Sequence, residues 1–404
     1  MKKNIHPDDA LDILYGLPVT QATETISTAS ALGRVLACDI EATIAIPPFD
    51  RSPFDGYAFR GEDTVNATPE NPVVLRITEE ISAGISPTIE VTPGFAAKIL
   101  TGAPIPKGAD CTVKYETTEF TDTEVKISRH VKSGKDIVPA GEDVKLGSII
   151  AHQGEVITPP LMGLIASVGL SEVSVFKLPC VALLNTGTEL IEPGQQLLPA
   201  KIYNSNASTL SGYLQSLGVE VNNFGVVPDD VVAISERIEA ALVVSDIVIT
   251  TGGASVGDYD FMIHAAERLG AELLFWKTQI KPGGSVVVAV KDNKLILGLS
   301  GNPGSAVMFL LRCALPYIKK LRGLVNCLSS PLEVFLKEPF DKPCERIRLL
   351  RGHLEIVDGK AYFAEYGAQG GGDISSFFGA DLLAEIPADS EPLSAGTLVK
   401  AWRL

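Results

Sequence analysis

The run TTGGASVGDYD, residues 250–260, follows the apolar segment DIVIT and places two adjacent glycines ahead of an acidic end. Glycines let a backbone approach a phosphate closely, and the neighbouring Thr and Ser hydroxyls add hydrogen-bond donors. Asp258 and Asp260 are carboxylates suited to a hard cation that would neutralise such a ligand. The stretch predicts an anion-binding loop at the end of a strand.

Two further loops of similar character follow it, KTQIKPGG at 277–284 and GLSGNPGSA at 298–306. Ligands of open α/β sheets bind beyond the carboxyl ends of the strands, so three such loops within about sixty residues predict a ligand crevice. If the second loop is a strand, Lys277, Gln279 and Lys281 project to one side and two ammonium groups can meet one polyanion. The alternatives are three ordinary turns and a solvated edge strand with two surface lysines.

The region 179–327 alternates strands with helices, which predicts a doubly wound, mainly parallel α/β domain. One helix carries Leu210, Tyr213, Leu214 and Leu217 on a single face and is closed by Gly218. A second helix begins after Asp229 and Asp230, residues that suit an N-cap.

The rest of the chain divides into smaller units around this domain. Helical periodicity over 7–40, broken by Gly16 and Pro18, ends in the Pro-rich run IPPFDRSPFDGYAF, which cannot be a helix interior and marks a passage between modules. Short strands such as VVLRI and TVKYE then predict a small β-rich domain. The expected domains are a discontinuous N-terminal linking and dimerisation domain (1–49 and 143–178), the small β-rich domain (50–142), the α/β domain (179–327) and a C-terminal β domain (328–404).

Composition narrows the class of function. The 404 residues carry a net charge of −15, which opposes non-specific binding to nucleic acid or to anionic membranes. The sequence has no apolar run of the ~18 residues that a membrane span needs and no signal-peptide core, so we expect a cytoplasmic protein. Its six scattered cysteines predict reduced, mostly buried thiols and no structural zinc.

Eight segments resemble, in order, the motifs of the molybdopterin molybdenumtransferase (MoeA) family, whose animal counterpart is the E domain of gephyrin. The resemblance runs from about residue 5 to the C-terminus, and eight ordered blocks are very specific. The segments are PPFDRSPFDGYAFR (47–60), TGAPIPKGAD (101–110), AGEDV (140–144), NTGTEL (185–190), IYNSN (202–206), TTGGASVGDYD (250–260), FWKTQIKPGG (275–284) and SGNPGSA (300–306).

The resemblance implies the last step of molybdenum cofactor synthesis. Adenylylated molybdopterin binds, its pyrophosphate bond to AMP is cleaved with Mg²⁺, and molybdate is inserted as a substrate. The family also implies a homodimer whose cleft is shared between the α/β domain of one subunit and the small β domain of the other, with other cofactor-synthesis proteins and apo-molybdoenzymes as further partners. A tungstate-inserting enzyme and a non-catalytic molybdopterin-binding scaffold stay open as alternatives.

The matched motifs also imply site residues. The expected catalytic residues are Asp55, Thr101, Asp143, Glu189, Asp229 and Asp260, of which Glu189 and Asp260 would hold the metal. The expected substrate-binding residues are Thr250, Thr251, Gly252, Gly253, Ser255, Gly257, Asp258, Lys277, Lys281, Pro282, Gly283, Ser300, Gly301, Asn302, Pro303, Ser305, Ser375 and Ser376. As alternatives, Asp55 and Asp143 only cap turns, and Asp229 is only an N-cap.

Three departures from the family pattern bear on the site. Val138 stands where the family usually has Arg before the GED turn, so one anion contact is missing or supplied from elsewhere. Ser300 replaces a proline and adds a hydroxyl, and Thr188 replaces an aspartate, which leaves Glu189 as the carboxylate of its motif.

Overall fold

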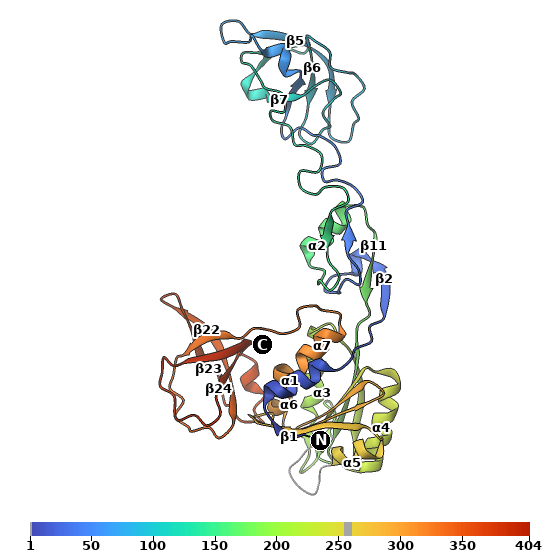
Figure 1. Cartoon of the computed structure of the whole chain (residues 1–404), viewed down its shortest axis with the longest axis vertical. Coiled ribbons are helices and arrows are strands. Elements are labelled where there is room, and N and C mark those ends of the chain that lie inside the picture. The colour runs from blue at the N-terminus through green and yellow to red at the C-terminus, as the bar shows by residue number, and fades with distance from the viewer. Residues whose placement is uncertain (1, 254–260) are drawn as a thin grey trace.

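The computed structural model describes residues 2–253 and 261–404. Met1 and residues 254–260 lie outside the described residues, and with them the predicted site residues Ser255, Gly257, Asp258 and Asp260. The chain forms an elongated molecule in which a small β module, a linking module and a larger two-domain body follow one another along the long axis (Figure 1).

The α/β domain is built on a seven-stranded sheet with the order β1-β17-β19-β20-β16-β12-β15. Its pairings are parallel except for the two that β19 makes, so the predicted mainly parallel sheet is confirmed. The strands are β1 (Lys2–Ile5), β12 (Cys180–Thr186), β15 (Glu220–Val227), β16 (Ile247–Thr251), β17 (Glu272–Thr278), β19 (Val286–Lys291) and β20 (Lys294–Leu299). A short parallel pair, β13 (Leu190–Ile191) and β14 (Ile202–Tyr203), lies beside it.

Helices cover both faces of this sheet because successive strand residues point to opposite sides. One core cluster contains Val181 and Leu183 with residues of α1, α3, α6 and α7, and the other contains Ala182 and Leu184 with residues of α4 and α5. The helices are α1 (Pro7–Gly16), α3 (Ser205–Ser216), α4 (Val231–Val244), α5 (Phe261–Arg268), α6 (Pro303–Phe309) and α7 (Leu315–Leu321), the last two joined through the π-helical turn Leu310–Ala314.

The first residues of the chain differ from expectation. The helix ends at Gly16, where the periodicity is broken, but it does not resume after Pro18, and β2 (Thr23–Ser27) follows instead. β1 is an edge strand of the seven-stranded sheet, and Ala10 and Leu14 of α1 are buried in that domain's core. Residues 2–16 therefore pack in the α/β domain and not with the linking unit, to which the sequence assigned them.

The linking module lies between the β module and the body (Figure 1). β2 pairs with β11 (Glu172–Phe176), and β3 (Ile40–Glu41) pairs with β10 (Ile149–Ala151). α2 (Pro159–Ser167) closes a small core with Leu36, Ile157 and Val175. This module joins chain segments on both sides of the β module, so the β module is an insertion in it.

The β module is a six-stranded sheet of order β7-β4-β6-β5-β9-β8, as the short strands of the sequence predict. Tyr57, Phe59 and Leu75 lie in its core. Its strands are β4 (Gly56–Phe59), β5 (Val73–Ile81), β6 (Phe95–Ile99), β7 (Cys111–Lys114), β8 (Glu119–Phe120) and β9 (Glu124–Ile127).

The C-terminal domain is a six-stranded sheet of order β18-β22-β23-β21-β25-β24. Its first strand, β18 (Ile280–Lys281), comes from within the α/β region and pairs with β22, so one strand is shared across the domain boundary. The other strands are β21 (Leu332–Leu336), β22 (Ile347–Val357), β23 (Lys360–Glu365), β24 (Leu382–Ile386) and β25 (Leu398–Arg403).

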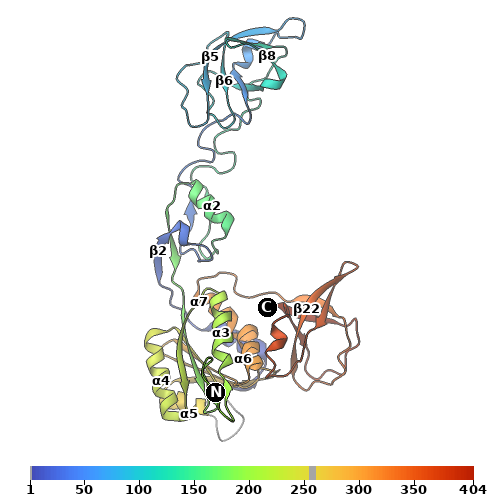
Figure 2. The ribbon, with the colours of Figure 1, turned by 180° about the vertical axis from the view of Figure 1, so that it is seen from behind.

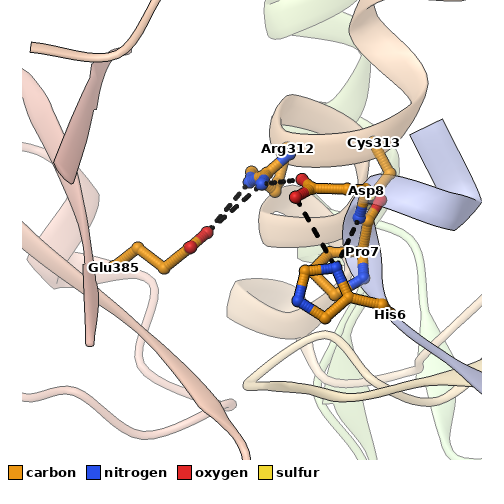
Figure 3. A network of polar contacts seen from close by, with 6 residues as sticks. All are labelled: His6, Pro7, Asp8, Arg312, Cys313 and Glu385. Atoms are coloured by element: carbon orange, nitrogen blue, oxygen red, sulfur yellow. Dashed lines mark hydrogen bonds and ion pairs between the residues drawn. The ribbon is translucent and has the colours of Figure 1, made fainter. Parts of the chain in front are cut away.

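A buried arginine ties the C-terminal domain to the α/β domain (Figure 3). Arg312, in the π-helical turn, places Nη2 2.5 Å from Asp8 Oδ1 of α1 and 3.2 Å from Glu385 Oε2 of β24. Its guanidinium lies 4.3 Å from the ring centroid of Trp402. Three segments that are distant in sequence meet at this one side chain.

Candidate functional site

The predicted anion-binding loops lie at one edge of the sheet. β12, β16, β20 and β17 run in the same direction and end at Thr186, Thr251, Leu299 and Thr278. Because carboxyl ends of parallel strands share an edge, the loops after them meet there. We call this edge the rim.

The glycine loop is held by close backbone contacts. A Cβ on Gly252, whose φ is +90°, would lie 2.3 Å from the carbonyl oxygen of Thr186, and one on Gly301 would lie 3.5 Å from Gly252 Cα. Only glycine fits the first position. Thr250 and Thr251 are buried, and their hydroxyls contact Met262 Sδ at 3.2 Å and the Asn185 side chain at 2.6 Å. Both hydroxyls thus have partners within the α/β domain.

Four buried polar residues of the rim were not among the predicted site residues. Asn204 is the N-cap of α3 and donates to Asn185 Oδ1 at 3.2 Å, while Asn206 donates to the carbonyl oxygen of Gly301 at 2.8 Å. Thr186 Oγ1 lies 2.6 Å from where a Cβ on Gly252 would sit, and it has no hydrogen-bond partner in the described residues. All four residues lie in the family-like segments NTGTEL and IYNSN, which could have identified them as site residues from the sequence.

The two predicted acids of the rim have different surroundings. Glu189 is exposed, and its carboxylate oxygens lie 2.6 and 2.7 Å from the position a Cβ on Gly187 would take. Asp229 precedes the actual N-cap of α4, because it is the Asp230 carboxylate that accepts from the Ala233 N–H at 2.8 Å. The interpretation of Asp229 as the capping side chain is therefore wrong, and its carboxylate is left for another role.

Lys277 and Lys281 do not share one strand. Lys277 adopts a φ of +66°, β17 ends at Thr278, and Lys281 belongs to β18 of the other sheet. The backbone N–H of Gln279 donates to the carbonyl oxygen of Ile5 at 2.9 Å, so contact with the N-terminal strand fixes the turn. The predicted same-side strand is wrong, yet both lysines line the same cavity.

That cavity, of about 1150 Å³, lies between the α/β and C-terminal domains. The predicted residues that line it are Lys277, Lys281, Pro282, Gly283, Ser300, Asn302 and Ser305. Pro303 begins α6 beside it, and the backbone N–H of Ser305 donates to the carbonyl oxygen of Gly371 at 3.1 Å, so it is not available to a ligand. Ser375 is exposed and Ser376 buried, with its hydroxyl on the Asp373 carbonyl oxygen at 3.0 Å, and neither lines the cavity.

Charge within the cavity is opposite to that of the whole chain. Five basic side chains stand in its wall against three acidic ones, in a chain of net charge −15. A cleft that concentrates one sign of charge attracts ligands of the other sign. The basic residues are Lys3, Lys277, Lys281, Arg346 and Arg348, and the acidic ones are Glu345, Asp389 and Glu391.

Asp55 and Thr101 lie together in the β module. The Asp55 carboxylate accepts from both the hydroxyl and the backbone N–H of Thr101, and these hydrogen bonds hold the pKa of Asp55 below its ordinary value. Asp143 is exposed in the turn where the chain returns to the linking module. Within one chain, the linking module separates these residues from the rim (Figures 1 and 2).

The departures also have structural settings. Val138 pairs with Arg51, the backbone N–H of Arg51 donating to the Val138 carbonyl oxygen at 2.9 Å. Ser300 Oγ accepts from the Asn302 N–H at 3.2 Å, and the Thr188 carbonyl oxygen accepts from the Lys201 ammonium group. The backbone of Arg51 thus pairs with the position where the expected arginine is absent.

Comparison with known proteins follows the same division of the chain. Family models match at residues 5–169 (MoeA N-terminal region, domain I and II), 182–320 (probable molybdopterin binding domain) and 333–404 (MoeA C-terminal region, domain IV). The chain belongs to the MoeA family. The resemblance and the fold class expected from the sequence are confirmed.

Full-length relatives of this MoeA family member have matching names. The molybdopterin molybdenumtransferase of Staphylococcus epidermidis is 33% identical over 374 residues, 93% of this chain and 89% of that protein. That of Bacillus subtilis is 34% identical over 382 residues, 94% of this chain and 89% of that protein. A crystal structure of the molybdopterin biosynthesis MoeA protein from Pyrococcus horikoshii superposes with a TM-score of 0.86 at 30% identity and covers 98% of each chain. No helix among the described residues is long and apolar enough to cross a membrane.

Proposed function

We propose that this protein is a molybdopterin molybdenumtransferase, which inserts molybdenum from molybdate into adenylylated molybdopterin and releases AMP. The observation that carries the proposal is the basic cavity between the α/β and C-terminal domains, in an acidic chain of the MoeA family. Both substrates are oxyanions. Lys277 and Lys281 would neutralise phosphate or molybdate oxygens in this cavity.

The rim would bind the phosphate-bearing part of the substrate. Gly252 and Gly253 have no side chains to keep a ligand from their backbone, and the Thr186 hydroxyl beneath Gly252, which has no partner among the described residues, would be a donor. The Asn206 side chain donates to the carbonyl oxygen of Gly301 and so holds the loop that follows β20. Thr186 and Asn206 would therefore add buried polar groups to the glycines and acids of the predicted site.

Magnesium is part of the proposal. Among the described residues, no group of three or more His, Cys, Asp or Glu side chains could hold a metal ion. Mg²⁺ bound through substrate phosphates and water needs only one or two protein carboxylates. The exposed Glu189 would supply one of them, and Asp260, which lies outside the described residues, would supply the second. When bound, the ion would polarise the phosphate oxygens of the scissile bond.

The active form would be a cytoplasmic homodimer. Asp55 and Thr101 lie in a module that the linking module separates from the rim of the same chain (Figure 2). A second chain with the opposite orientation would bring its β module to that rim, and isologous pairing would make two such clefts. Arg51 would then supply the guanidinium that Val138 lacks.

The proposal is tested by incubating the purified protein with adenylylated molybdopterin, molybdate and Mg²⁺. We expect release of AMP and formation of molybdenum cofactor, measured by reconstitution of an apo-molybdoenzyme. Turnover with tungstate alone would identify the tungstate-inserting alternative. Tight binding of the substrate without AMP release under all these conditions would identify the scaffold.

A further inference from the structure

The N-terminal strand adds a cation to the cavity from outside the family motifs. β1 pairs with β17 so that Lys3 stands opposite Trp276, and the Lys3 Nζ lies 4.4 Å from the Trp276 ring centroid. Two hydrogen bonds from Gln279 hold this strand, one to the Asn4 carbonyl oxygen at 3.0 Å and one to that of Ile5 at 2.9 Å. Lys3 lines the cavity.

A second lysine lies on the same indole. Lys277, in a left-handed conformation that a lysine rarely adopts, brings its Nζ to 4.2 Å from the Trp276 ring centroid. Two ammonium groups held on one ring repel each other, and a ring face offsets only part of that repulsion. Within the described residues, neither lysine has a carboxylate in ion-pair contact. An anion bound near both ammonium groups would offset this repulsion.

Thr278 is an independent sign of a ligand at this place. Its side chain is fully buried, lines the cavity, and leaves its hydroxyl without a hydrogen-bond partner in the described part of the chain. A buried donor without a partner is costly, and an oxyanion in the cavity would accept from it.

We propose that Lys3, Lys277 and Thr278, with Trp276 as the platform for both ammonium groups, form an oxyanion subsite at the β1–β17 edge of the cavity. The inference rests on the proposed function, because the ligand class is a tetrahedral oxyanion, either a substrate phosphate group or molybdate. Lys3 is thereby a binding residue contributed by the N-terminal strand.

Tryptophan fluorescence tests the subsite without turnover. The chain has two tryptophans, so the full-length Trp402→Phe protein leaves Trp276 as the only one. In this background, pyrophosphate, AMP and molybdate are titrated separately against Lys3→Met and against Lys2→Met as the matched control. Lys2 stands opposite Phe275 and does not line the cavity.

We expect Lys3→Met to weaken binding of at least one anion about three- to tenfold, with the loss shrinking at high salt, and Lys2→Met to leave it unchanged. Lys3→Arg should restore binding. Thr278→Val should weaken the same anion, and Thr278→Ser should not. The anion affected distinguishes a phosphate subsite from a molybdate subsite.

Equal affinities for Lys3→Met and Lys2→Met would overturn the subsite while leaving the proposed function intact, since wild-type binding and turnover would persist. A wild-type protein that binds none of the three anions would overturn the subsite, and AMP release measured in parallel would tell whether the proposed function falls with it.

Discussion

The Asp55 carboxylate accepts two hydrogen bonds from Thr101 through a single oxygen, at 2.7 Å from the hydroxyl and 2.7 Å from the backbone N–H. Both favour the ionised form and lower the pKa of Asp55. If an ionised Asp55 acts in the cleft, its lowered pKa keeps the carboxylate charged as the pH falls.

We expect Thr101→Val to raise the pKa of Asp55, because it removes the hydroxyl hydrogen bond and leaves the backbone one. The ionised form is then lost at a higher pH, so the acid limb of kcat/KM for AMP release should move upward. Thr101→Ser keeps the hydroxyl and should leave the limb in place. A Thr101→Val limb at the wild-type position would mean that ionisation of Asp55 does not control the rate.

Asp55 and Glu189 should act in one cleft from different subunits. An Asp55→Ala chain and a Glu189→Gln chain, each inactive alone, should regain activity when mixed, because one of the two clefts in a mixed dimer carries both intact groups. Recovery should reach up to about half of the sites in a mixed dimer. Without recovery after verified subunit exchange, the shared cleft is excluded.

Glu189→Gln and Asp260→Asn should each abolish Mg²⁺-dependent AMP release while the protein stays folded, since each would remove a carboxylate from the proposed metal site. Asp230→Asn is the matched control, because asparagine caps a helix about as well as aspartate and Asp230 caps α4. Wild-type rates in Glu189→Gln or Asp260→Asn would remove that residue from the metal site.

Lys277→Ala and Lys281→Ala should weaken pyrophosphate and molybdate binding more than they change the melting temperature, because partly exposed lysines add little to folding but hold a polyanion by charge. The loss should shrink as salt rises. Lys107→Ala, in the β module with its side chain 82% exposed, is the charge-matched control. Unchanged affinity with a large drop in melting temperature would instead assign these lysines a structural role.

Arg312→Ala should destabilise the protein by about 2–4 kcal/mol, because it leaves the partly buried Glu385 carboxylate without its cation. The Arg312 side chain is 4% exposed and that of Glu385 16%, whereas Asp8 is 64% exposed. Asp8→Asn should therefore cost no more than about 1 kcal/mol. Urea unfolding followed by circular dichroism measures both, and a larger loss in Asp8→Asn would assign the main partnership to α1.

The sequence was sufficient where local pattern and burial agree. The apolar runs that became β12 and β16 alternate with amphipathic helices, so the mainly parallel sheet and the edge that gathers the glycine loops could be predicted. Similarly, the strand-rich stretch of the β module contains no long amphipathic run that competes with strands.

The sequence was insufficient where contacts with distant segments determine the local structure. The strand expected through Lys277 and Lys281 is broken because Gln279 bonds to Ile5, a residue more than two hundred positions away, and because Lys281 joins the C-terminal sheet. The same contact between Gln279 and Ile5 helps to hold β1 in the α/β domain, whereas the sequence assigned it to the linking unit. The buried asparagines of the rim have no periodicity, and only their motifs could have revealed them.

The pairing of β18 with β22 attaches Lys281 to the C-terminal domain, opposite Arg348, while Lys277 stays with the α/β sheet. The ammonium groups of Lys277 and Lys281, two of those that line the cavity, are thus carried by different sheets, and a tilt of one domain against the other would change their separation. Since Coulomb energy varies inversely with distance, such a tilt alters the field that an anion meets. The relative placement of the two domains thus sets part of the charge distribution that lines the cavity.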